Sequence, residues 1–444
     1  MGHQFILYGD SCSGVPKALH EKTHAKINNI IRTLSPPPEF IIFPGDEVIG
    51  LTTDETALRQ QWQYWLNHEM AWLDQTAIPL YNCTGNHTTY SPMSERIFAE
   101  MLSHLPRNGA PNQSGLSYFI RRGDLLLVFV HTLCSHLGGE GHVETQWLDE
   151  TLKQNSDAKY KLVIGHHPVF PVNGYEGNYQ RTIGAEYTQK FWSILKQQGV
   201  MAYLCSHILA FDTQIHDGIL QITTAGAGTA HRMPEEVEYL HAVKMAIDEK
   251  GIQYQVLDDE GTLRERLVWP INLPSSRQWQ PINQGQQVAP LTGTFAADKA
   301  DPAIVSLRIS GKTAKSSTGQ RQTILAAFSD GDSSTPLWIG LSGKTQQVTI
   351  MLQIQAGRSP HYWFGPELGL DAKFDIQLLM HTGLAAGGIM SRTADDAPWT
   401  SLISRSATGL EKLNWPKIWS VGNDASDDLP FLGIDLAVKS ICKF

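Results

Sequence analysis

The sequence lacks several features that would place it in a specialised class of protein. None of its 444 residues belong to an apolar run of about 18 residues, the length that a membrane span needs. Lys and Arg number 35 against 44 Asp and Glu, and the net charge of −9 argues against a general nucleic-acid binder. The five cysteines include no CxxC pair, so a disulfide framework is not expected. What is present is an ordinary globular composition, with 41% hydrophobic and 18% charged residues.

The length predicts two domains, because a single hydrophobic core rarely extends over more than about 250–300 residues. We place a first domain at residues 1–272, a linker at 273–290 and a second domain at 291–444. No secretory signal precedes the first predicted strand, which predicts a cytoplasmic protein for the chain as written. A secreted or periplasmic protein would follow if an N-terminal signal had been trimmed. The oligomeric state is not predictable from the sequence.

The first domain alternates apolar strands with amphipathic helices, the pattern of an α/β protein. A helix is predicted from Thr53, as its N-cap, to residue 73. Short strands follow residue 219, so we expect a four-layer α/β sandwich. Beyond the linker, short alternating runs at 303–309, 322–328 and 346–354 predict an all-β sandwich.

Five polar clusters follow apolar runs of the first domain. They are Gly9-Asp10, Gly45-Asp46, Gly85-Asn86-His87, Gly165-His166-His167-Pro168 and Ser206-His207. Because the carboxyl ends of strands in such a sheet meet at one crevice, we expect the clusters to converge. Carboxylate, amide oxygen and imidazole together suit Mn, Fe or Zn. A carboxylate between two such metals, about 3.5–4 Å apart, would help to hold a phosphoryl group for attack by water.

The clusters resemble the motifs of the calcineurin-like metallophosphoesterases, which include the purple acid phosphatases. The family order is Asp-x-His, Gly-Asp, Gly-Asn-His, a single His and Gly-His-x-His, and the resemblance covers roughly residues 4–270. The second, third and fourth motifs are intact. The first and fifth are degraded, because Cys12 and Leu209 stand where the family has histidines. Purple acid phosphatases supply a Tyr three residues after the bridging Asp, and here that residue is Ile49.

The resemblance implies a metal-dependent phosphomonoesterase or phosphodiesterase with one or two divalent or trivalent transition metals (Mn, Fe or Zn). A metal-activated water would attack, and His87 would act as general acid or phosphoryl stabiliser. Asp46 would bridge the metals and, with Asn86, His166 and His207, complete one site. Asp10 would serve the other site, where Cys12 is an additional candidate ligand. Downstream of Leu209, the residues close enough in sequence to compensate for it are Asp212 and His216.

A glycine-rich segment, residues 137–142, is interpreted as a mobile active-site loop. Its Glu140 and His142 are loop residues of a kind more often solvated than functional. His142 and His167 are nevertheless our candidate substrate contacts. The expected partner is a phosphorylated small molecule or sugar, and residues 173–181 are the loop expected to decide between monoester and diester.

Two other functions are compatible with the sequence. The loss of two ligands would suit a pseudo-phosphoesterase that binds a phosphorylated ligand without hydrolysing it. The second domain loosely resembles a concanavalin-like lectin sandwich, with Trp399, Trp415 and Trp419 in its last part, so a carbohydrate-binding protein is the other alternative. A sandwich that only covers the catalytic domain would fit the same pattern.

Overall fold

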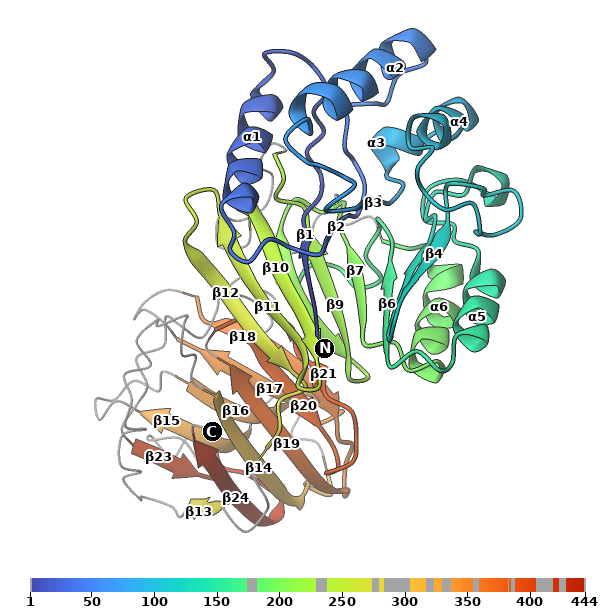
Figure 1. Cartoon of the computed structure of the whole chain (residues 1–444). Helices are drawn as coiled ribbons and strands as arrows, with labels where there is room; N and C mark the ends of the chain where they lie inside the picture. Colours follow the sequence, from blue (N-terminus) through green and yellow to red (C-terminus); the bar gives the residue numbers. More distant parts are fainter. Residues whose placement is uncertain are drawn as a thin grey trace. The chain divides into compact units, whose positions relative to one another are not determined.

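The structure is a computed structural model of the whole chain. It describes residues 2–173, 182–228, 238–273, 279–282, 304–316, 323–329, 337–353, 359–381, 383–384, 388–404, 418–422 and 429–442. The chain divides into two compact units (Figure 1). The first comprises Met1–Val172, Glu176–Thr213 and Ile219–Pro270; the second comprises Asn173–Tyr175, Gln214–Gly218 and Ile271–Phe444. Most of the predicted linker, and residues 174–181 of the predicted specificity loop, lie outside the described residues.

Two six-stranded sheets build the first unit. The first sheet has the order β12-β11-β10-β1-β2-β3, with β1 at His3–Leu7, β2 at Phe40–Phe43, β3 at Leu80–Asn82, β10 at His241–Asp248, β11 at Gly251–Asp258 and β12 at Leu263–Trp269. The second has the order β4-β5-β6-β7-β9-β8, with β4 at Tyr118–Arg122, β5 at Leu125–Phe129, β6 at Tyr160–Ile164, β7 at Ala202–Cys205, β8 at Phe211–His216 and β9 at Ile219–Thr224. Strands β1, β2 and β3 are parallel, and so are β5, β6, β7 and β9. All residues of β2, β5 and β6 are buried, which explains why β2 and β5 are continuous apolar runs.

Helices cover the outer faces of both sheets (Figure 1). Their bounds are α1 Leu19–Arg32, α2 Glu55–Tyr64, α3 Asn86–Thr89, α4 Pro92–Met101, α5 Thr145–Gln154 and α6 Ala185–Gln197. On the first sheet, His24 of α1 and Trp65 contact Phe43 of β2. On the second, leucines of α5 and aromatic residues of α6 share one core with β5, β6 and β7. This arrangement confirms the predicted four-layer α/β sandwich.

The helix predicted over residues 53–73 differs from the observed one at both ends. Its N-cap is Asp54, not Thr53, because the Asp54 carboxylate accepts from the backbone N–H groups of Thr56 and Ala57 at 2.8 and 3.1 Å. The α-helix ends at Tyr64 and continues as a π-helical turn, Trp65–Glu69. A π turn shifts the side chains that follow it, so a regular helical period could not place Glu69 correctly.

The second unit confirms the predicted all-β class. One sheet has the order β13-β24-β14-β19-β20-β21, with β13 at Gln280–Ile282, β14 at Ile304–Lys312, β19 at Lys373–His381, β20 at Ile389–Arg392, β21 at Thr400–Ser401 and β24 at Ile434–Cys442. The other has the order β22-β18-β17-β16-β15-β23, with β15 at Thr323–Ser329, β16 at Leu337–Ser342, β17 at Gln347–Leu352, β18 at His361–Glu367, β22 at Ile403–Ser404 and β23 at Ile418–Val421. Alternate residues of both sheets meet in one apolar core around Trp363.

No helix in the described parts of the chain is long and apolar enough to cross a membrane.

Candidate metal centre and active site

The predicted site residues lie in loops that leave the strands in an unusual backbone conformation. Asp10, Asp46 and His207, which follow β1, β2 and β7, have φ angles of 61°, 58° and 69°. Non-glycine residues adopt this left-handed region rarely, and such residues gather at functional sites. The first two loops are tied together, because Asp10 N donates to Gly45 O at 3.1 Å and Cys12 N donates to Asp46 O at 2.8 Å. These backbone hydrogen bonds therefore hold the Cα positions of Asp10 and Asp46 relative to each other.

Four predicted ligands bring their side-chain donor atoms into mutual contact. Asn86 Oδ1 lies 3.0 Å from His166 Nε2 and 2.8 Å from His207 Nδ1, and the two nitrogens are 3.2 Å apart. Asp46 Oδ2 lies 3.2 Å from His166 Nε2. A tetrahedral metal with bonds of about 2.0–2.2 Å separates its ligand atoms by about 3.3–3.5 Å, only slightly more than these distances. The donor set therefore fits a transition metal.

Backbone carbonyl groups determine which ring nitrogen faces this cluster. His166 Nδ1 lies 2.9 Å from Pro44 O, and His87 Nδ1 lies 2.6 Å from Ile49 O. A carbonyl oxygen can only accept, so each Nδ1 carries the proton and donates it. Nε2 is consequently the nitrogen that each ring presents to a ligand. Such a hydrogen bond to the far nitrogen is the usual support of a metal-binding histidine.

Burial and close charges act strongly on the acidic groups. Burial, reinforced by the charge of Asp46, raises the pKa of Asp10 to about 7. Burial also acts to raise the pKa of Asp46, but the charges of His166 and His87 outweigh it and lower this pKa to about 2. Although burial opposes it, the Asp46 carboxylate raises the pKa of His166 to about 9. Charged groups packed this closely in a buried site are typical of functional centres.

The second metal position of the family is incomplete. The ligand atoms of Cys12, Asp46 and His87 all lie within 4.8 Å of one another, so these three could hold an ion. Leu209 has no donor atom. Among the described residues, neither Asp212 nor His216 belongs to a group of three candidate ligands with metal spacing.

Of the two predicted substrate contacts, His142 lies in the glycine-rich loop and His167 lies beside it. His167 Nε2 is 3.4 Å from Glu140 Oε1, and His142 Nδ1 is 3.1 Å from Glu140 O. Three glycines of the loop, at 138, 139 and 141, have positive φ angles of 132°, 93° and 83°, and the loop backbone bonds to residues 132, 134 and 184. The loop thereby brings Glu140 into a group with His167 and His207. The only sequence signal for Glu140 was one carboxylate among glycines.

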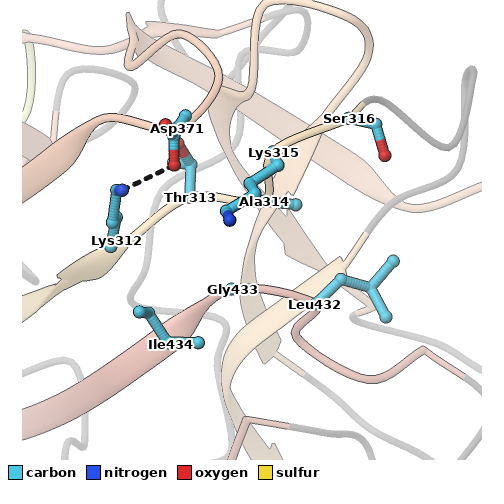
Figure 2. Close-up of a pocket in the computed structure, with 9 residues that line it drawn as sticks. All are labelled: Lys312, Thr313, Ala314, Lys315, Ser316, Asp371, Leu432, Gly433 and Ile434. Atoms are coloured by element: carbon cyan, nitrogen blue, oxygen red, sulfur yellow. Dashed lines mark ion pairs between the residues drawn. The ribbon is translucent and has the colours of Figure 1, made fainter.

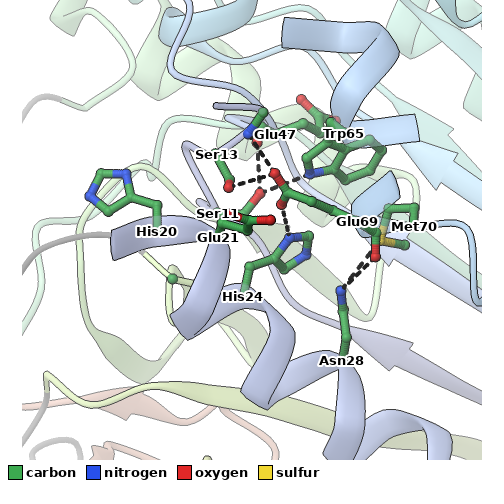
Figure 3. A network of polar contacts seen from close by, with 12 residues as sticks. Ser11, Ser13, His20, Glu21, His24, Asn28, Glu47, Trp65, Glu69 and Met70 are labelled. Carbon is green, nitrogen blue, oxygen red and sulfur yellow. Dashed lines mark hydrogen bonds and ion pairs between the residues drawn. The ribbon is translucent and has the colours of Figure 1, made fainter. Parts of the chain in front are cut away.

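A buried polar network supports the loop that carries Asp10 (Figure 3). Glu69, at the end of the π turn, accepts hydrogen bonds from Ser13 Oγ and Gly14 N, both at 2.8 Å. Its other oxygen lies 2.7 Å from His24 Nδ1 on α1. The network thus joins α1 and the π turn to the residues just after Asp10. No pattern in the sequence selects Glu69, because its role depends on the π turn.

The second unit contains one pocket of note among its described residues (Figure 2). Its volume is about 370 Å³, and Lys312 in its wall pairs with Asp371 at 2.5 Å. No aromatic residue lines it. Trp399 is buried beneath Arg392, whose guanidinium lies 4.6 Å from the ring centroid, so the indole offers no face to a sugar. Trp415 lies outside the described residues, and of Trp419 only the backbone is described.

The sheets bring carboxylate, amide and imidazole groups together in a candidate metal centre. The sequence model of the calcineurin-like phosphoesterases matches residues 4–211. A comparison with curated proteins found no match.

Three solved structures each match about three fifths of this chain. The purple acid phosphatase PPD1 from yellow lupin (Lupinus luteus) seeds is 11% identical, with a TM-score of 0.45 over 60% of this chain and 53% of the lupin chain. A dimetal phosphatase from Danio rerio is 14% identical, with a TM-score of 0.44 over 58% of this chain and 96% of its own. GAP50, the anchor in the inner membrane complex of Plasmodium, is 15% identical, with a TM-score of 0.41 over 62% of this chain and 90% of its own. The chain thus spans about half the length of the lupin protein, and the likeness to the calcineurin-like phosphoesterases rests on the sequence match over residues 4–211.

Proposed function

We propose that the first unit hydrolyses phosphate esters with a transition metal held by Asp46, Asn86, His166 and His207. The observation that carries this proposal is the contact of Asn86 Oδ1 with both imidazole nitrogens, at 3.0 and 2.8 Å. Two imidazoles around one amide oxygen, beside a buried carboxylate, are a ligand set for Mn, Fe or Zn. When bound, the metal supplies Lewis acidity and a water activated near neutral pH.

His87 is the proposed general acid. Its backbone N–H donates to Asp46 Oδ1 at 2.8 Å, and its Nδ1–H donates to Ile49 O, so the ring is held at two points. To act as the acid the ring must be the imidazolium, in which Nδ1–H stays on Ile49 O and Nε2–H is the proton delivered to the leaving oxygen. Positioned proton transfer of this kind contributes about 10²–10⁴-fold to a rate.

The first experiment measures metal content and hydrolysis of an aryl phosphate monoester and diester, with Mn or Zn added. We expect about one tightly bound metal at the Asp46 site, and loss of both this metal and turnover in Asp46→Asn and His166→Gln. Unchanged metal content and turnover in these two variants would refute the proposed site. The assay also decides between monoester and diester.

The role of His87 needs a second experiment, in which the leaving group is varied. A general acid matters most for a poor leaving group, so His87→Asn should lose about 10²–10⁴-fold with an alkyl phosphate and far less with a nitrophenyl phosphate. Metal content should not change. The control is His68→Asn, because His68 is an exposed residue of the π turn with 64% side-chain exposure. An equal loss for both substrates would show that His87 is not the acid.

A second candidate function is favoured by Leu209, which leaves the family's second metal position without one ligand. On this alternative the unit binds a phosphorylated ligand without hydrolysing it. Saturable binding of inorganic phosphate by the metal-loaded protein, with no turnover of any ester, would establish the alternative. The domain limits 1–272 and 291–444, a phosphorylated small-molecule or sugar substrate, and the location in the cell stay proposals.

A further inference from the structure

We propose that Glu140, His167 and His207 form a second transition-metal site, on the side of His207 that faces away from Asn86. This inference rests on the proposed function, because His207 also serves the Asp46 site. The ligand atoms of the three residues lie within 4.8 Å of one another. Two imidazoles and one carboxylate are a set that binds Zn or Fe in other proteins.

The geometry at His167 is that of a ligand. His167 is fully buried, and its Nδ1 is occupied by the Thr132 hydroxyl at 2.8 Å. Its Nε2 makes no hydrogen bond within the described structure, although a buried ring nitrogen normally has one. The nearest acidic atom, Glu140 Oε1, lies at 3.4 Å, which is the separation of two ligands around a tetrahedral metal, about 3.3–3.5 Å.

His207 presents a different nitrogen to each side. Its Nδ1 lies 2.8 Å from Asn86 Oδ1, whereas its Nε2 lies 4.0 Å from Glu140 Oε1. The second distance is somewhat longer than a ligand pair requires, and a small rotation of the Glu140 side chain would shorten it. Glu140 comes from the glycine-rich loop, and its side chain is 20% exposed although the Oε1 atom that faces His167 is buried.

The position explains how a second metal could bind although the family's usual position is degraded. With both ions bound, His207 would be an imidazolate whose ring proton has been released to solvent, and metals on the two nitrogens of one ring lie farther apart than the about 3.5–4 Å of a paired-metal clamp. The second ion would therefore not share the Asp46 carboxylate. Its role would be to bind a substrate oxyanion beside the reacting centre, and the two ions would influence each other through His207.

The rival position is the group of Cys12, Asp46 and His87, which also has metal spacing. Two variants separate the positions. Glu140→Gln removes a charged ligand from our site and keeps the shape of the side chain, and Cys12→Ser does the same for the rival. The matched control is Glu186→Gln, because Glu186 pairs with His142 of the same loop at 3.5 Å and has 59% side-chain exposure.

The experiment is metal analysis of the full chain, dialysed against Zn or Mn, together with a thermal melt that shows each variant to be folded. We expect two equivalents in the wild type, in Cys12→Ser and in Glu186→Gln, and one in Glu140→Gln. His167→Gln should repeat the loss. Two equivalents in Glu140→Gln, or a loss in Cys12→Ser alone, would overturn the inference.

One equivalent in the wild type that disappears in His166→Gln and persists in Glu140→Gln would also overturn this inference, while the proposed function would stand. No bound metal in a folded wild type would overturn both. The two failures are therefore distinguishable.

Discussion

Gly85 lies against the proposed bridging carboxylate, and its replacement by alanine offers a direct test of the metal centre. The Gly85 backbone has φ −142° and ψ 167°, an extended conformation that any residue adopts. The effect of Gly85→Ala is therefore steric. An added Cβ would lie 2.2 Å from Asp46 Oδ1 and 2.5 Å from Asp46 N, where ordinary contacts are 3.4–4 Å.

Both the carboxylate and the backbone N of Asp46 must retreat by about 1 Å to accommodate this methyl group, and such a displacement of a reacting group costs on the order of 10²-fold in rate. The retreat would also lengthen the bond from His87 N to Asp46 Oδ1, now 2.8 Å. We expect kcat/KM for an aryl phosphate to fall about 10²-fold. Metal affinity should weaken as well. The measurements are kcat/KM and metal content, each taken with the metal in excess and again after dialysis.

The control for backbone effects is Gly123→Ala. Gly123 has φ +57° in the turn between β4 and β5, and an added Cβ would meet no atom within 4 Å. This variant should lose about 1–2 kcal/mol of stability through strain and keep its metal and its turnover. Wild-type metal content and kcat/KM in folded Gly85→Ala would show that this contact does not position Asp46, and would refute the reasoning.

Three further predictions concern stability. Burial lowers the pKa of His241 to about 4, so the folded state takes up this proton only at lower pH than the unfolded state, whose histidine titrates near 6.5. The contribution of His241 to stability should be complete above pH 6.5 and fall by about 3 kcal/mol as the pH drops to 4. Because burial also lowers the pKa of His167 and His216 to about 4, His241→Gln should make the total fall, measured by urea unfolding across that range, smaller by about this amount; an equal fall in the variant and the wild type would contradict the prediction. Asp54→Ala removes two hydrogen bonds from the start of α2 and should cost about 1 kcal/mol of unfolding free energy while turnover is unchanged; a loss below a few tenths of a kcal/mol would contradict the cap. Ile339→Ala empties a fully buried position in the second unit and should lower the unfolding free energy by about 2–5 kcal/mol, as measured by calorimetry. Metal content should be unaffected; a metal loss as large as that of His166→Gln would contradict the view that packing in the second unit does not affect metal binding.

The sequence located the loops of the site because each follows a continuous apolar run that could only be a buried strand. Asp10, Asp46, Asn86, His166 and His207 do converge, as the parallel strands require. The nitrogen that each histidine presents could not be predicted, because it depends on the carbonyl groups of Pro44 and Ile49 across the site. Assignment of these residues to metal binding and catalysis stays a prediction until the variants are measured.

Two residues with evident structural roles carried little or no signal. Glu140 reaches its position only because three glycines adopt positive φ angles, and nothing in a single sequence states how such a loop folds. Glu69 depends on a π turn that interrupts a regular helical period. Both are acidic residues whose partners are distant in sequence, which local patterns do not encode.

The second unit is assembled from three separate stretches of chain, and this has a consequence for synthesis. The side-chain amide of Asn173 donates to Leu402 O at 3.1 Å, and Ile215 N donates to Ser401 Oγ at 2.9 Å. On a ribosome, Asn173 and Ile215 emerge long before these partners. At about 5–20 residues per second, the interval is on the order of 10–40 s. The two early segments of the nascent chain must therefore stay without these partners until strands near the C-terminus have been synthesised. A polypeptide truncated before residue 399 would never form these bonds.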